Sequence, residues 1–223
     1  MDSLNVRQEI ISTACDFNVS GISTGTSGNL SVRHENGFLI TPTGLAYNDL
    51  KPEDIILCDP KGKVISGRLI PSSEWPFHVA IYAARNDVNA IVHVHSPYAT
   101  GLACTRKPIP AFHYMVAIAG GNSIPCSEYA TFGSDELALN VVAALTGRSA
   151  CLLANHGMVA VGDSIATAYK LAQEVEALAK RYCICLQFGN PVLLDDKEME
   201  TNIEKFHRYG KQDMKTPSLT LFA

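Results

Sequence analysis

Pairs of short strands, joined by tight turns and separated by helical segments, constrain the fold of this chain more than any other feature of its sequence. Residues 29–41 alternate apolar with polar side chains around Asn36-Gly37, a dipeptide typical of hairpin turns. We expect a second hairpin at 55–65 and a further strand pair at 151–161. Antiparallel pairing therefore opens the predicted sheet.

Amphipathic segments lie between these strand pairs and predict helices. Their apolar residues recur at the spacing of a buried helix face, and capping residues or prolines mark several of the starts. The expected helices lie at 4–17, 74–85, from 97 onward, 134–147, 163–188 and 196–208. A strand rich in β-branched residues is expected at 90–95. This alternation, without repeat or linker, predicts one domain of layered α/β or α+β architecture.

Composition narrows the class of protein further. A chain of 223 residues, 47% of them hydrophobic, can bury a sizeable core without staples. The 18 basic and 22 acidic residues leave a net charge of -4, which argues against nucleic-acid partners. The seven cysteines include no C-x-x-C pair and are interpreted as free thiols in a reducing compartment. With no signal-peptide pattern and no apolar stretch near the ~20 residues of a membrane span, we expect a cytoplasmic protein without membrane partners.

Two histidines on the strand at 90–95 predict a metal site. His93 and His95 stand two residues apart, so both side chains leave the same face of the strand. Their ring nitrogens can then approach the separation of roughly 3.3 Å that tetrahedral zinc implies. His156 lies in a polar turn between apolar strands, which makes it the expected third ligand. Taken singly, each of these histidines also fits a core, edge or turn position.

A carboxylate would complete such a set, because it can leave the metal and act as a base. Glu74 is the candidate, at the start of a helix shortly before the strand of His93. Its alternative role is only to complement the helix dipole. His78 and His113 are further candidates, which we interpret as supporting or core histidines.

Three turns of small polar residues predict an anion site. The chain has no P-loop and no strand followed by G-x-G-x-x-G, so a nucleotide cofactor has no support. It offers instead the amides and hydroxyls of Gly25–Asn29, Thr41–Gly44 and Ser72-Ser73, the last of these at a helix N-terminus. Such groups can bind phosphate without lysine or arginine. Taken singly, however, each of these turns can also be a chain reversal with no binding role.

Taken in order, these motifs resemble the class II aldolase/adducin family, most closely its members that act on L-fuculose 1-phosphate. The matching stretches are 25–31, 40–44, 72–75, 93–95 and 155–157, with others at 109–115, 120–126, 129–133 and 205–210. We therefore expect a single class II aldolase domain at 1–210. Residues 211–223 would form a C-terminal tail that is flexible or covers the active site.

The resemblance implies an α/β fold of three layers, α/β/α, around a central, mainly antiparallel sheet. It also implies a homotetramer with active sites between subunits and one zinc ion (Zn2+) per subunit. The implied zinc ligands are Glu74, His93, His95 and His156. The implied phosphate contacts are Ser27, Gly28, Asn29, Thr43, Gly44, Ser72 and Ser73. The tyrosines that would reach a neighbouring subunit's site are Tyr114 and Tyr209, although each can also simply pack.

Cleavage of a carbon–carbon bond next to a ketone leaves a carbanion, which needs a lysine Schiff base or a metal. The lysines fall in turns, on polar helix faces or in the tail, so the metal route is favoured. We expect a ketose 1-phosphate to be cleaved to dihydroxyacetone phosphate and a small aldehyde such as L-lactaldehyde. Glu74 would shuttle the C1 proton, and Tyr114 would serve the aldehyde oxygen.

Three alternatives stay open. The substrate can instead be 5-deoxyribulose or methylthioribulose 1-phosphate in a salvage pathway. The chain can also be a pentulose-phosphate 4-epimerase, although those enzymes carry aspartate where Glu74 stands. Finally, adducin-like members of the family serve as non-catalytic binding modules, a reading that His93, His95 and His156 argue against.

Overall fold

An eight-stranded sheet organises the computed structural model, which describes residues 3–35 and 37–208. The strands lie in the order β4-β3-β2-β1-β5-β8-β7-β6, and every neighbouring pair is antiparallel except β6 and β7. Their bounds are β1 (Asn29–His34), β2 (Gly37–Ile40), β3 (Ile56–Cys58), β4 (Val64–Ser66), β5 (Ala90–Val94), β6 (Cys126–Ser127), β7 (Ala150–Leu153) and β8 (Gly157–Gly162). The expected hairpin and strand pairs are present, so the sheet is mainly antiparallel as predicted.

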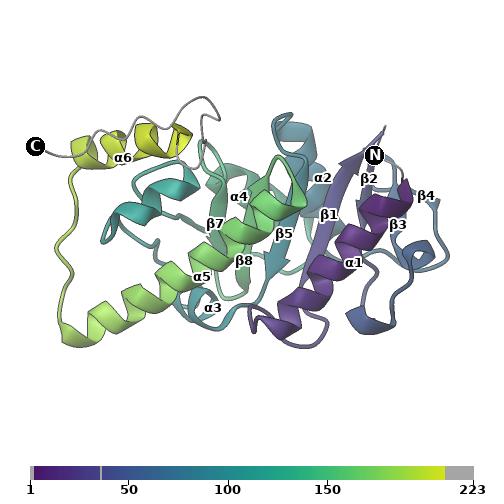
Figure 1. Ribbon diagram of the computed structural model, residues 1–223, viewed down its shortest axis with the longest axis horizontal. Coiled ribbons are helices and arrows are strands. Elements are labelled where there is room, and N and C mark those ends of the chain that lie inside the picture. The colour runs from purple at the N-terminus through teal and green to yellow at the C-terminus, as the bar shows by residue number, and fades with distance from the viewer. Residues whose placement is uncertain (1–2, 36, 209–223) are drawn as a thin grey trace, which may run out of the picture.

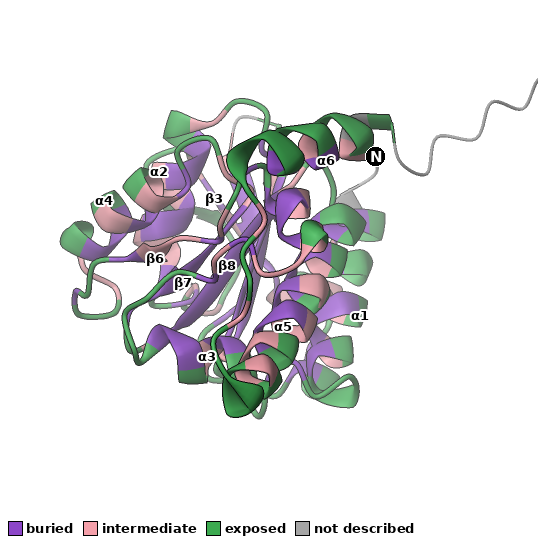
Figure 2. Cartoon of the chain, turned by 90° about the vertical axis from the view of Figure 1, so that its left-hand side faces the viewer, coloured by how far each residue is buried: buried purple, intermediate pink, exposed green. Residues whose placement is uncertain are grey.

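Helices cover both faces of this sheet (Figures 1 and 2). One buried cluster joins the sheet to α1, α3 and α5, and a second joins it to α2 and α4. The helices are α1 (Ser3–Val19), α2 (Trp75–Ala84), α3 (Pro97–Ala103), α4 (Asp135–Ala144), α5 (Ile165–Phe188) and α6 (Asp196–Arg208), with the 3-10 helices η1 (Tyr47–Asp49), η2 (Pro52–Asp54) and η3 (Tyr114–Ala119). The predicted three-layer α/β/α fold is confirmed.

Strand β5 lies at the centre of the sheet, between β1 and β8, and is buried along its whole length. Its side chains alternate between the two faces, as the period of two requires. Val92 and Val94 pack in the cluster under α1, α3 and α5, whereas Ile91 packs toward α2 and α4. The ring of His93 meets Phe77 of α2 edge-on, so this histidine lies on the face that α2 covers.

Some of the predicted elements differ from the structure. The helix expected at 134–147 ends at Ala144, and the 3-10 helices η1, η2 and η3 and the short parallel strand β6 were not expected. The predicted tail 211–223 and the domain end at 210 lie outside the described residues. Within 3–35 and 37–208, no helix is long and apolar enough to cross a membrane.

Candidate active site

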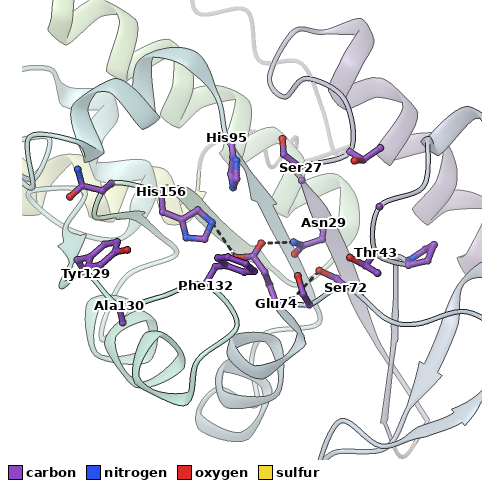
Figure 3. Close-up of a pocket in the computed structure, with 16 residues that line it drawn as sticks. Ser27, Asn29, Thr43, Ser72, Glu74, His95, Tyr129, Ala130, Phe132 and His156 are labelled. Carbon is purple, nitrogen blue, oxygen red and sulfur yellow. Dashed lines mark hydrogen bonds and ion pairs between the residues drawn. The ribbon is translucent and has the colours of Figure 1, made fainter.

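A pocket of about 400 Å³ opens where β1, β5 and the start of α2 meet (Figure 3). All seven predicted phosphate residues line it, together with three of the four predicted metal ligands; the complete lining is Thr26–Asn29, Pro42–Gly44, Ser72–Glu74, His95, Tyr129, Ala130, Phe132, Asn155 and His156. The fourth predicted ligand, His93, is buried beneath this surface. The fold therefore brings both predicted sets of residues to one place.

The four predicted ligands form one compact cluster. The ligand atoms of Glu74, His93, His95 and His156 all lie within 4.8 Å of one another. Nε2 of His93 is 3.0 Å from Oε2 of Glu74 and 3.0 Å from Nε2 of His95, and Nε2 of His156 is 3.1 Å from Oε1 of Glu74. These distances are close to the roughly 3.3 Å between ligands of tetrahedral zinc.

Strand pairing and one tight turn bring the histidines together. His93 comes from the centre of β5, and His95 follows directly after its end. The turn that leads into β8 holds Asn155 at a φ of 54° and places His156 beside them. A Cβ on Gly157 would lie 2.6 Å from the carbonyl oxygen of Val94 and 2.9 Å from the ring of His95, so this turn requires glycine.

Glu74 enters the cluster from the N-cap position of α2. Its side chain makes no capping hydrogen bond to the helix, so complementing the helix dipole is not its main contact. Asn29 donates to Oε2 of Glu74 at 2.9 Å. Oε1 is buried and lies 3.1 Å from Nε2 of His156.

These residues fit a divalent metal ion. Nδ1 of His93 lies 2.9 Å from the carbonyl oxygen of Met158, which can only accept a hydrogen bond. Nδ1 therefore carries the proton, and the lone pair of Nε2 faces the cluster, an arrangement common behind metal-bound histidines. Three imidazole nitrogens and one carboxylate are a donor set that suits zinc.

Electrostatics favour the protonation states that metal ligands need. Burial by itself would raise the pKa of Glu74, but the facing rings of His93 and His156 lower it well below its ordinary range. Burial and then the neighbouring His93 and His156 lower the pKa of His95 to about 4. A carboxylate and a neutral imidazole therefore face one another at neutral pH, ready to bind a metal.

The three turns form the opposite wall of the pocket, which we call the anion wall. In Figure 3, Ser27, Asn29, Thr43 and Ser72 lie on one side of Glu74, and His156 lies on its other side. The backbone N–H of Thr43 donates to Ile70, and that of Ser72 donates to Thr41. These two amides are therefore not free to bind an anion, contrary to the expectation from the sequence. They hold neighbouring segments of the pocket wall together instead. The hydroxyl of Ser72 accepts from the Glu74 amide at 3.3 Å, which links this wall directly to the metal cluster.

Of the two predicted tyrosines, Tyr114 does not line this pocket within its own chain. Tyr114 opens η3, is 49% exposed, and stacks near His113 and Phe206 instead. Tyr209 lies outside the described residues. The ring of His113 accepts from the backbone N–H of Met115 and caps η3, so it is not part of the cluster.

Four pocket residues had no role assigned from the sequence: Tyr129, Ala130, Phe132 and Asn155. The first three belong to a loop that packs against the anion wall, since a Cβ on Gly133 would lie 2.8 Å from the carbonyl oxygen of Ser73. The guanidinium of Arg106 lies 5.4 Å from the Tyr129 ring and donates to Asn155 at 2.7 Å. A glycine preceded by two aromatic residues was the available sequence signal for this loop.

Comparison with known proteins gives consistent results. Residues 8–183 match the class II aldolase and adducin N-terminal domain. A 5-methylthioribulose-1-phosphate/5-deoxyribulose-1-phosphate aldolase of Rhodospirillum rubrum is 52% identical over 205 residues, 92% of each chain. An L-fuculose phosphate aldolase of Escherichia coli K12 is 46% identical over 211 residues, 94% of this chain and 98% of the other. A solved L-fuculose 1-phosphate aldolase is 43% identical and superposes with a TM-score of 0.89. The match covers 93% of this chain and 100% of the other.

Proposed function

This chain belongs to the class II aldolase and adducin family, and on that premise we propose that it cleaves a ketose 1-phosphate reversibly to dihydroxyacetone phosphate and a small aldehyde. The chain is a class II aldolase, a carbon–carbon lyase of a metal-dependent family, and its substrate is a phosphorylated sugar. The observation that carries the proposal is the single pocket in which the metal cluster faces the small-residue turns.

The first candidate substrate is L-fuculose 1-phosphate, which would yield L-lactaldehyde. The second is 5-deoxyribulose or methylthioribulose 1-phosphate, and the relative at 52% identity carries those substrates in its name. The candidates share the ketose 1-phosphate end and differ at the aldehyde end. The anion wall and the metal cluster therefore suit all of the candidate substrates. The remaining residues of the pocket would select among them.

The phosphate would lie against Ser27, Gly28, Asn29, Thr43, Gly44, Ser72 and Ser73. Among the described residues, no lysine or arginine lines the pocket, so we propose that hydroxyls, the Asn29 amide and backbone dipoles supply the attraction. A pocket of this kind selects a phosphate by fit as much as by charge. It holds the C1 end of the sugar in register with the metal cluster.

One zinc ion per subunit would be held by Glu74, His93, His95 and His156. When bound, the ion stabilises the negative charge that develops on the substrate oxygens. Glu74 is the proposed base for the C1 proton. Asn29 holds its Oε2, while the buried Oε1 lies 3.1 Å from Nε2 of His156 and is the oxygen proposed to accept the proton.

Tyr114 and Tyr209 would act from a neighbouring subunit of a homotetramer. Tyr114 is half exposed and does not line the pocket of its own chain, which supports this arrangement. Exposed apolar side chains at the end of α5 and in the segment after it are suited to a subunit interface: Ile184, Leu186, Phe188, Val192 and Leu193. We also extend the proposal to a cytoplasmic location, one domain at 1–210, and a tail at 211–223 that covers the aldehyde end.

Turnover of the purified protein on a panel of ketose 1-phosphates tests this function. L-fuculose, 5-deoxyribulose and methylthioribulose 1-phosphates would be compared by the release of dihydroxyacetone phosphate, measured through its reduction by a coupled dehydrogenase. We expect release from at least one of them, abolished by a chelator and restored by zinc. Epimerisation of a pentulose phosphate without cleavage would favour the epimerase instead. A protein without bound metal or turnover would favour a binding module.

A further inference from the structure

A row of buried polar side chains runs from the metal cluster into the interface between β1 and α2. The carboxylate of Glu74 is 2.9 Å from the amide nitrogen of Asn29, and Oδ1 of Asn29 is 2.6 Å from Nε2 of His78. Nδ1 of His78 is 2.7 Å from the hydroxyl of Ser31, which is 2.8 Å from the hydroxyl of Tyr82. All five residues are buried, and His78 and Ser31 have no exposed surface.

The repeat of a helix matches the repeat of a strand along this row. Glu74, His78 and Tyr82 are four residues apart at the start of and along α2, so they share one helix face and follow one another by about 6 Å. Asn29 and Ser31 are two apart on β1 and share one strand face, about 6.6 Å apart. The two sets therefore interleave, and each strand residue bonds two helix residues.

The charge on Glu74 determines the direction of every bond in the row. A carboxylate can only accept, so the amide nitrogen of Asn29 donates to it and Oδ1 of Asn29 must accept at the other end. Nε2 of His78 therefore carries the proton, and its Nδ1 accepts from the hydroxyl of Ser31. That hydroxyl in turn accepts from Tyr82. Burial supports a neutral ring, since it lowers the pKa of His78 to about 3.

We infer that His78 is a positioning residue for Glu74, which it holds through the Asn29 amide. The donor on Nε2 occupies Oδ1 of Asn29 and so keeps the amide nitrogen turned toward Oε2. Asn29 then holds Oε2 of Glu74, and the carboxylate faces His93 through Oε2 and His156 through Oε1. This inference rests on the proposed function, because it assumes that Glu74 acts as a metal ligand.

A purely structural role for His78 predicts something different. In that case an apolar residue in place of His78 would support zinc binding equally well. Any other loss of packing in α2 would then change zinc affinity to the same extent. A positioning role requires a donor at the place of Nε2. Removal of a residue that supports a metal ligand typically lowers metal affinity by about 10- to 100-fold.

Zinc affinity of the full-length protein, measured by competition with a chromophoric chelator, separates the two roles. His78→Leu should weaken zinc binding by about 10- to 100-fold. His78→Gln places an amide donor near the position of Nε2 and should recover most of that affinity. Ile81→Ala is the matched control, because Ile81 is buried on the same helix but packs in the apolar cluster. It should lower the melting temperature without changing zinc affinity.

The inference is overturned if His78→Leu binds zinc as wild type does, if His78→Gln is no better than His78→Leu, or if Ile81→Ala weakens binding equally. Should His78→Leu not fold, wild-type protein labelled with ¹⁵N-histidine and Ser31→Ala serve instead. The nitrogen chemical shifts of His78 should show the proton on Nε2, and Ser31→Ala should weaken zinc binding in the same direction. A proton on Nδ1, or unchanged affinity in Ser31→Ala, overturns the inference.

Failure of the proposed function gives a different pattern from failure of this inference. Wild-type protein that binds no zinc overturns the proposed metal set and the inference with it. Wild-type protein that binds zinc while His78→Leu binds it equally well overturns the role of His78 alone.

Discussion

The two ends of the pocket differ in how firmly the fold holds them. The metal end is built on the central strand β5 and the start of α2, where His93 is 0% exposed and Glu74 is anchored by a buried hydrogen-bonded row. The other end is a loop in which Tyr129 is 49% and Phe132 is 65% exposed. Groups held by a sheet keep a fixed geometry, whereas exposed loop side chains can change without cost to the core. We therefore expect the shared chemistry to lie at the buried end and the choice of aldehyde to lie at the exposed end.

The largest expected effect comes from removing a histidine of the buried end. His93→Ala or His156→Ala should lose the metal and, with it, at least about 10³-fold in activity, because a bound metal contributes several kcal/mol to the barrier. Apart from the edge-on contact of His93 with Phe77, the apolar clusters on both faces of the sheet are built from other side chains, so the fold should persist. Elemental analysis and circular dichroism would check both parts. Full metal content in either variant would remove that histidine from the site.

Glu74→Gln tests whether the carboxylate does more than hold the metal. The amide keeps the size and one acceptor oxygen, so metal binding should weaken only partly. Loss of a positioned base typically costs about 10²- to 10⁴-fold in rate, roughly 3 to 5 kcal/mol. The measurement is exchange of the C1 proton of dihydroxyacetone phosphate with deuterated water in zinc-loaded protein, with no aldehyde present. Exchange at nearly the wild-type rate would assign the proton to another base.

Tyr114 tests whether the exposed end is completed by another subunit. Tyr114→Phe and His95→Ala should each be nearly inactive alone, because each removes a group needed at the site. Mixed tetramers of the two should recover a fraction of wild-type activity, since some sites then combine an intact cluster with an intact tyrosine. Mixing after mild dissociation, with assembly verified by native mass spectrometry, gives the measurement. Absence of recovery in verified mixed tetramers would place Tyr114 outside the shared site.

The smallest expected effect concerns the exposed loop and tests the comparison directly. Phe132→Leu should leave metal content and melting temperature unchanged, because the ring is largely exposed. It should alter the ratio of kcat/KM between L-fuculose 1-phosphate and 5-deoxyribulose 1-phosphate by about 10-fold, the low end of the effect of a small change in an apolar contact. An equal loss on both substrates would show that Phe132 supports the common chemistry instead.

Local patterns in the sequence predicted much of the buried end. His93 and His95 follow from the period of a strand, and His156 stands out as a polar residue between two apolar strands. The small-residue turns were also visible, since clustered glycine, serine and threonine residues offer backbone amides and hydroxyls to an anion. What these patterns could not show is which amides the folded chain uses internally, as it does at Thr43 and Ser72.

The sequence by itself determined the strand pairs, the amphipathic helices and the residue types that can hold a metal or a phosphate, because each depends on neighbours a few positions away. Only the tertiary structure decided that Asn29 and Glu74, 45 residues apart, are hydrogen-bonded, and that His78, 49 residues from Asn29, supports them. It also decided that Tyr114 does not line the pocket of its own chain. Such contacts depend on how strand β1 lies against helix α2, and local periodicity carries no information about that packing.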